Sequence, residues 1–171
     1  MQDATLVLLG TSHRLQCGAP QVAPAAVALF RTEVERICDE FAIKRIAEEM
    51  HGPGLRRHGV SRTVAQGIAR RRKLAHRSID LAPRLRATLS LDDSVMLGIA
   101  FGEYGVQAAR FRDAFGVLWS DVRERAWLGR LLAGSEWPTL FVCGADHTDS
   151  VERLWRSLEL PITVKHRDYE P

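Results

Sequence analysis

The sequence of 171 residues has only three cysteines, Cys17, Cys38 and Cys143, and none of them forms a C-x-x-C pair. An odd, scattered set argues against a disulfide framework or a zinc knuckle and fits a reducing compartment. No apolar run approaches the roughly 20 residues that a membrane-spanning helix needs. The first residues carry Asp3 in place of the basic start of a signal peptide. These absences predict a cytoplasmic protein that does not enter a membrane.

Several nucleotide-binding and catalytic motifs are also missing. The chain has no G-x-G-x-x-G after its first predicted strand, no G-x-x-x-x-G-K-[ST] and no G-x-S-x-G. Hydride-transfer enzymes, P-loop NTPases and α/β-hydrolases are therefore disfavoured. No aromatic residue lies among the basic residues at 56–62 and 70–73, which argues against a stacking surface for single-stranded nucleic acid.

Mostly apolar, β-prone runs alternate with amphipathic segments along the chain. Strands are predicted over 5–9, 42–47, 74–79, 139–143 and 162–165. Helices are predicted over 24–41, 61–73, 111–132 and 151–158, with Ser61 as the cap of the second helix and a loop over 51–54. This order predicts one α/β domain over 1–171, with a mainly parallel sheet and helices on both faces. Residues 81–105 are predicted to be an insertion or a lid.

Polar residues follow the predicted strands, and in an open parallel sheet ligands bind beyond the carboxyl ends of the strands. We therefore expect a site built from the polar groups at these ends, namely His13, Glu48, Glu49, Asp146 and His147. Because side chains alternate faces along a strand, only one of the two adjacent glutamates is expected to contact the site.

This set of side chains suits a limited range of chemistry. Two imidazoles and a carboxylate fit a divalent transition metal such as zinc, manganese or cobalt, with His13, Glu48 and His147 as predicted ligands. A metal with an open position would lower the pKa of bound water to about 7. Without a metal, a histidine with a carboxylate partner could act as general base. Asp146 is expected to orient an imidazole, and Cys143, at the end of an apolar strand, to be a structural thiol.

Four segments resemble the TraB/TIKI/GumN group of proteins and its erythromycin esterase and ChaN relatives. They are LVLLGTSH (6–13), RIAEEM (45–50), RERAWL (123–128) and TLFVCGADH (139–147). The resemblance extends to small bacterial proteins of about this length. Ala126 stands where the TraB-type sequences usually carry an aspartate after their E-R pair.

The resemblance implies a metal-dependent protease or an esterase. His13, Glu48 or Glu49 and His147 would then be ligands or catalytic residues, and Arg125 would bind an anionic intermediate or a substrate carboxylate. ChaN relatives bind haem, which would make the protein a binding module instead.

Three hypotheses follow from the sequence. The first is a cytoplasmic hydrolase of a small-molecule or peptide substrate, acting on an ester or amide. The second is a module that binds haem or another anionic small molecule, with Arg56, Arg57 and Arg62 contacting its carboxylates or phosphates. The third is a nucleotide- or nucleic-acid-handling enzyme that uses the basic run at 70–73, a run that more often forms a solvated helix face.

Overall fold

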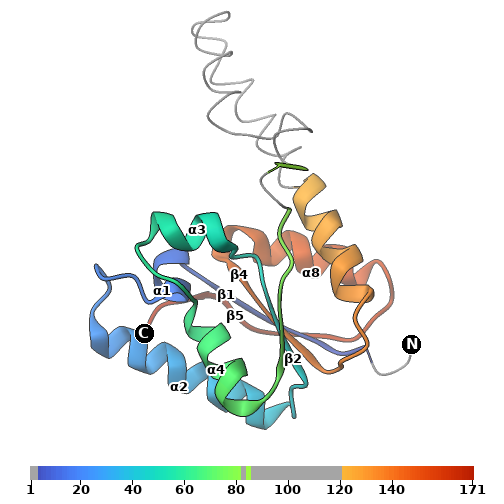
Figure 1. Ribbon diagram of the computed structural model, residues 1–171. Helices are drawn as coiled ribbons and strands as arrows, with labels where there is room; N and C mark the ends of the chain where they lie inside the picture. Colours follow the sequence, from blue (N-terminus) through green and yellow to red (C-terminus); the bar gives the residue numbers. More distant parts are fainter. Residues whose placement is uncertain (1–3, 82–83, 86–120) are drawn as a thin grey trace, which may run out of the picture.

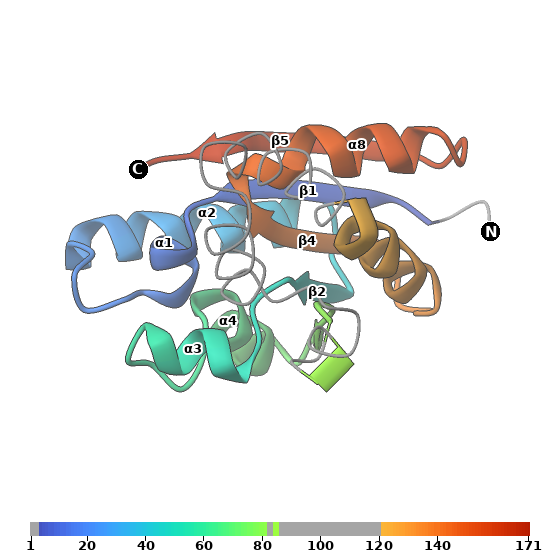
Figure 2. The ribbon, with the colours of Figure 1, turned by 90° about the horizontal axis from the view of Figure 1, so that it is seen from above.

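The computed structural model describes residues 4–81, 84–85 and 121–171. These residues contain a five-stranded sheet of parallel pairs in the order β3-β2-β4-β1-β5, and Figure 2 shows β4 between β1 and β2. The strands are β1 (Leu6–Thr11), β2 (Arg45–Glu48), β3 (Ala75–Ser78), β4 (Thr139–Gly144) and β5 (Ile162–Tyr169). The predicted α/β class is confirmed.

Helices cover both faces of this sheet (Figure 1). One face is covered by α2 (Pro24–Glu40) and α4 (Val64–Arg72), and the other by α8 (Thr148–Arg156) and a helix over 121–132. Shorter helices follow three strands: α1 (His13–Cys17) after β1, α3 (Gly52–Arg57) after β2, and the 3-10 turn η2 (Ala145–His147) after β4. Among the described residues, no helix has the length and apolar character needed to cross a membrane.

Alternate strand residues enter two separate hydrophobic cores. The core under α2 and α4 takes Val7, Leu9, Ile46, Leu140 and Val142 from the strands. The core under α8 and the 121–132 helix takes the residues between them: Leu6, Leu8, Ala47, Phe141 and Cys143. Each fully buried Leu, Ile, Val or Phe contributes about 1.5–3 kcal/mol relative to an exposed one. The same alternation sends Glu48 toward α4 and Glu49 toward the opposite helices.

Local signals explain where several elements begin and end. Ser12 Oγ accepts a hydrogen bond from Leu15 N at 3.2 Å and starts α1, which ends at Gly18 in the left-handed conformation with φ 58°. Pro24 lies in the first turn of α2, as predicted. The cap of α4 is Thr63, whose Oγ1 accepts from Gln66 N at 2.9 Å, so the prediction of Ser61 was two residues early.

Two other boundaries differ from the predictions. The expected loop at 51–54 is instead the start of α3, because His51 Nδ1 accepts from Gly54 N at 3.3 Å and Pro53 suits a first helical turn. The second strand begins at Arg45 and not at Ala42, which has a φ of 49°. Apart from residues 81, 84 and 85, the proposed insertion or lid at 81–105 lies outside the described residues.

Candidate functional site

The order of the strands brings together polar residues that are far apart in the sequence. β4 pairs with β1 on one side, where Gly144 is opposite Thr11, and with β2 on the other, where Val142 is opposite Glu48. The carboxyl ends of β1, β2 and β4 are therefore neighbours. The residues that follow them include His13, Glu49 and His147.

Glu49 lies between the two histidines. Its carboxylate is buried, with 3% of the residue exposed. Oε1 accepts a hydrogen bond from His13 Nε2, and Oε2 lies 3.9 Å from His147 Nε2. Oε2 has no hydrogen-bond partner among the described residues. The side chain of His13 is 46% exposed and that of His147 12% exposed, so solvent reaches the cluster mainly from the His13 side.

Gly144, the last residue of β4, provides the space that these side chains occupy. A Cβ atom at this position would lie 3.0 Å from His13 Nε2, 3.3 Å from Glu49 Oε1 and 3.5 Å from His147 Cδ2. All three side chains thus meet above one backbone position. The sequence signal for Gly144 is its place at the end of the apolar run 139–143, just ahead of Asp146 and His147.

Glu124 fixes the ring of His147. The carboxylate of Glu124, 3% exposed, lies with Oε1 2.7 Å from His147 Nδ1. Trp127 meets the imidazole edge-on, with ring centroids 4.9 Å apart and an interplanar angle of 80°. These contacts leave Nε2 directed toward Glu49. Sequence reasoning missed Glu124, which lies three residues before Trp127 and hence on the same side of the helix.

The positive charge of Arg123 acts on the site, where it lowers the pKa of both His13 and Glu49. Its Nε and Nη2 both donate to the carboxylate of Asp80, each at 3.1 Å, and its guanidinium stacks 4.8 Å from the ring of Trp127. Trp127 Nε1 donates to Asp80 Oδ1 at 2.9 Å. Arg125, predicted to bind an anion at the site, is exposed and pairs with Asp121 at 2.9 Å on the outer side of the helix.

Glu48 lies apart from His13 and His147. Its Oε1 accepts from Thr63 Oγ1 at 2.6 Å and lies 2.8 Å from His76 Nε2, on the side of the sheet that α4 covers. The predicted metal set of His13, Glu48 and His147 is therefore not brought together, because adjacent residues at a strand end face opposite ways. Glu49 takes the place expected of Glu48.

The remaining predicted residues are Asp146, Arg56, Arg57 and Cys143. Asp146 is exposed in η2, and the carboxylate that orients His147 is Glu124. Arg56 and Arg57 are exposed on α3. Cys143 is fully buried, and burial raises the pKa of its thiol well above the ordinary value, as expected of a structural cysteine.

The electrostatics favour an ion pair between Glu49 and His13. The hydrogen bond to Glu49 raises the pKa of His13 above its usual 6.5, although partial burial opposes this. Burial alone would raise the pKa of Glu49, but the hydrogen bond from His13 and the charges of His13, His147 and Arg123 together lower it below 4.5. Glu49 is thus a carboxylate near neutral pH.

The donor set is chemically suited to zinc, manganese or cobalt, and its atoms are spaced differently from the ligands of a tetrahedral zinc site. Two ligand atoms on a tetrahedral zinc lie about 3.3 Å apart. His13 Nε2 and Glu49 Oε1 are in direct contact, and His147 Nε2 is 3.9 Å from Oε2. Within residues 4–81, 84–85 and 121–171, no three His, Cys, Asp or Glu side chains are arranged to hold a metal ion. The metal therefore stays a prediction, as does haem.

Comparison of this chain with models of known protein families, with curated proteins and with solved structures found no match. The resemblance to the TraB/TIKI/GumN group consequently stays a prediction that depends on the four short segments that suggest it.

Proposed function

We propose that this protein is a hydrolase that cleaves an ester or amide bond in a small molecule or peptide, with His13 as general base and Glu49 as its carboxylate partner. One observation carries the proposal: a buried carboxylate from the end of one strand binds one imidazole and faces a second, and the two imidazoles follow two other strands. A buried carboxylate that orients a more exposed imidazole is an arrangement suited to general base catalysis.

The tautomer of His13 follows from its partner. The carboxylate of Glu49 only accepts, so His13 Nε2 carries the hydrogen of their bond and Nδ1 is the nitrogen that can take up a proton. Above the raised pKa of His13 the imidazole is neutral, and Nδ1 then removes a proton from water as the water oxygen attacks the carbonyl carbon. The imidazolium is stabilised by the charge of Glu49, and it returns the proton to the leaving oxygen or nitrogen when the tetrahedral intermediate collapses.

Arg123 supplies the positive charge of the site, which can stabilise the oxygen that becomes negative as the intermediate forms. Glu124 orients the ring of His147, whose Nε2 faces Glu49. Arg123 is held by Asp80 and Trp127 and adds a fixed positive charge nearby.

The test is a hydrolysis screen with p-nitrophenyl esters of short acids and with aminoacyl and peptidyl p-nitroanilides. We expect turnover by the parent protein and a drop in kcat of about 10²–10⁴-fold in His13→Ala, the usual contribution of a general base. His166→Ala is the matched control, because His166 pairs with Glu33 on α2 at 2.8 Å and should keep parental activity.

The same screen distinguishes the predicted metal from side-chain chemistry. Full activity after chelation and dialysis would support the histidine–glutamate mechanism. Activity that appears only with added zinc, manganese or cobalt would replace it with metal-assisted hydrolysis at the same residues. Equal rates in the parent and in His13→Ala would show that the site is not catalytic.

A further inference from the structure

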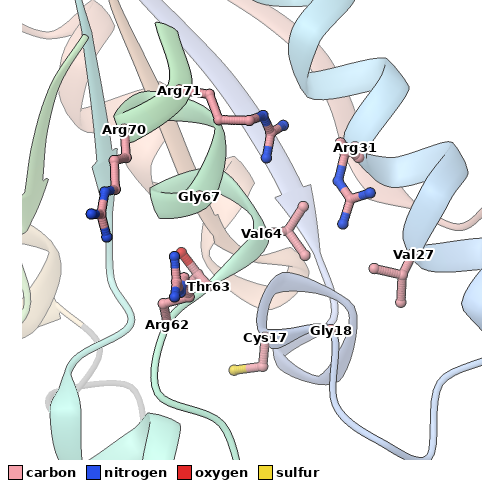
Figure 3. A pocket seen from close by; sticks show the side chains of 10 residues that line it. All are labelled: Cys17, Gly18, Val27, Arg31, Arg62, Thr63, Val64, Gly67, Arg70 and Arg71. Atoms are coloured by element: carbon pink, nitrogen blue, oxygen red, sulfur yellow. The ribbon is translucent and has the colours of Figure 1, made fainter. Parts of the chain in front are cut away.

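A groove lined by four arginines lies between α1, α2 and α4. It is bounded by the end of α1, by α2 and by the start of α4, and it encloses about 550 Å³ (Figure 3). Its arginines are Arg31 from α2, Arg62 before α4, and Arg70 and Arg71 from α4. None of the lining residues is acidic.

The charge in this groove is largely uncompensated. Arg71 pairs with Glu35 at 2.8 Å, but among the described residues no carboxylate forms an ion pair with Arg31, Arg62 or Arg70. Arg36, on the exposed side of α2, by contrast binds two glutamates of its own helix. The whole chain carries a net charge of only +3, so the groove concentrates as much positive charge as the entire protein has in excess. Like charges at this density repel one another unless an anion binds between them.

The shape of the groove favours a small molecule. Its volume falls within the roughly 300–1,000 Å³ of pockets that bind small ligands. Val27 and Val64 form an apolar part of the wall, and Gly67 keeps the surface of α4 open between the arginines. In Figure 3, Arg71 and Arg31 extend toward the space between α4 and α2. No lining residue is aromatic, which argues against stacked bases of a single-stranded nucleic acid.

We propose that this groove binds a small organic molecule carrying two or more phosphate groups. Arginine guanidinium groups match phosphate oxygens in paired hydrogen bonds. A phosphate carries a charge of about −1.5 to −2 at pH 7, so two phosphates balance the three arginines that lack a carboxylate partner. The start of α4 adds the partial positive charge of a helix N-terminus. The apolar wall formed by Val27 and Val64 contacts the organic part of the ligand.

Two elements of the groove lead toward the candidate catalytic site. His13 begins α1 and Cys17, at its end, lines the groove, a distance of about 6 Å along the helix axis. Thr63, which lines the groove, donates to Glu48, the residue before Glu49. Phosphate binding nevertheless needs none of the catalytic residues, so the proposal does not depend on hydrolysis.

The experiment is calorimetric titration of the full chain with sodium pyrophosphate, adenosine 5′-diphosphate and inorganic phosphate at physiological salt. We expect saturable binding of the diphosphates with a Kd of about 0.01–1 mM, and weaker binding of inorganic phosphate. Arg62→Ala and Arg70→Ala should each weaken binding about 10- to 100-fold, the effect of removing a charge-assisted pair. Arg72→Ala is the matched control. It lies outside the groove on the same helix, pairs with Asp39, and should change Kd by no more than about twofold.

A second pair of variants tests the position of the ligand. At Gly67 a Cβ would have only Arg71 Nη1 near it, at 3.8 Å, so Gly67→Ala should fold and bind like the parent. Gly67→Glu places a negative charge between the arginines and should abolish binding, with an unchanged circular dichroism spectrum. His13→Ala should bind diphosphate like the parent, whatever its activity.

Three results would overturn the proposal. The first is the absence of saturable binding by either diphosphate. The second is equal affinity of Arg62→Ala, Arg70→Ala, Gly67→Glu and the parent. The third is much tighter binding of a nucleic-acid duplex than of any diphosphate, with steep salt dependence, which would make the arginines an open contact surface for a polyanion.

Discussion

The adjacent glutamates at the end of β2, Glu48 and Glu49, provide the sharpest test of the site, because they face opposite ways and have different partners. The perturbation is the matched pair Glu49→Gln and Glu48→Gln. Each substitution keeps the shape of the side chain and removes one negative charge. Glu49 binds His13, whereas Glu48 binds Thr63 and His76.

The two variants should lose similar amounts of stability. Each weakens one hydrogen bond between a buried carboxylate and a histidine, and charge-assisted bonds contribute about 1.5–3 kcal/mol. The amide oxygen of the introduced glutamine still accepts a hydrogen bond and retains part of this stabilisation. We therefore expect the free energy of unfolding of each variant to fall by about 1–2 kcal/mol. For a chain of this size, that lowers Tm by roughly 2–8 °C. Thermal unfolding followed by circular dichroism measures this change.

Their effects on His13 should differ completely. The hydrogen bond from His13 to Glu49 is the largest cause of the raised pKa of this histidine. Glu49→Gln should therefore lower the pKa of His13, while Glu48→Gln should leave it unchanged. The assay is an NMR titration of the six imidazoles, with the His13 signal assigned by its absence in His13→Asn. On any substrate found in the screen, only Glu49→Gln should lower kcat by about 10²–10⁴-fold.

The reasoning would be refuted if the pKa of His13 were the same in Glu49→Gln and in the parent. It would also be refuted if Glu48→Gln lowered that pKa or the rate as much as Glu49→Gln. Either result would mean that the strand end does not direct the two glutamates to opposite faces.

Three further predictions follow from the same cluster. The stability that the His13–Glu49 pair contributes should be greatest between about pH 4.5 and 6.5, because it is lost as pH rises through the raised pKa of His13 and as pH falls through the lowered pKa of Glu49. The measurement is the difference in unfolding free energy between the parent and Glu49→Gln across this pH range, and a difference that does not change with pH would contradict the prediction. Gly144→Ala should lower activity at least about tenfold while Tm falls by less than in a core variant, because the new Cβ would lie 3.0 Å from His13 Nε2; parental kinetics would contradict the position of His13. Cys143 should react with a thiol reagent only after unfolding, because its thiol is buried and its pKa is raised; rapid labelling of the native protein would contradict this.

Much of the fold could be predicted from local patterns. All five strands were located, and for β1 and β4 the signal was a continuous apolar run, since burial between two helical layers requires apolar side chains on both faces. Three- and four-residue spacing of apolar residues located α2, because one face of this helix packs on the sheet. The helices α4 and α8 were also predicted. The short helices α1 and α3 were missed, because one or two turns carry no periodicity and depend on caps such as Ser12 and His51.

The sequence by itself determined which polar residues stand at the strand ends. His13, the pair Glu48–Glu49, and His147 could all be named as candidates, because a strand that ends in a polar turn is visible in the order of residues. Their convergence also followed from the rule that parallel strands place their carboxyl ends at one edge.

Only the tertiary structure decided which of these residues contact one another. The insertion of β4 between β1 and β2 places His147 beside Glu49, and no local pattern specifies the order of strands. The direction of a side chain at a strand end depends on the face that neighbouring helices cover, so Glu49 and not Glu48 meets His13. Glu124 and the arginine groove likewise depend on helices that pack from distant parts of the chain, and long-range packing of this kind is set by the whole fold.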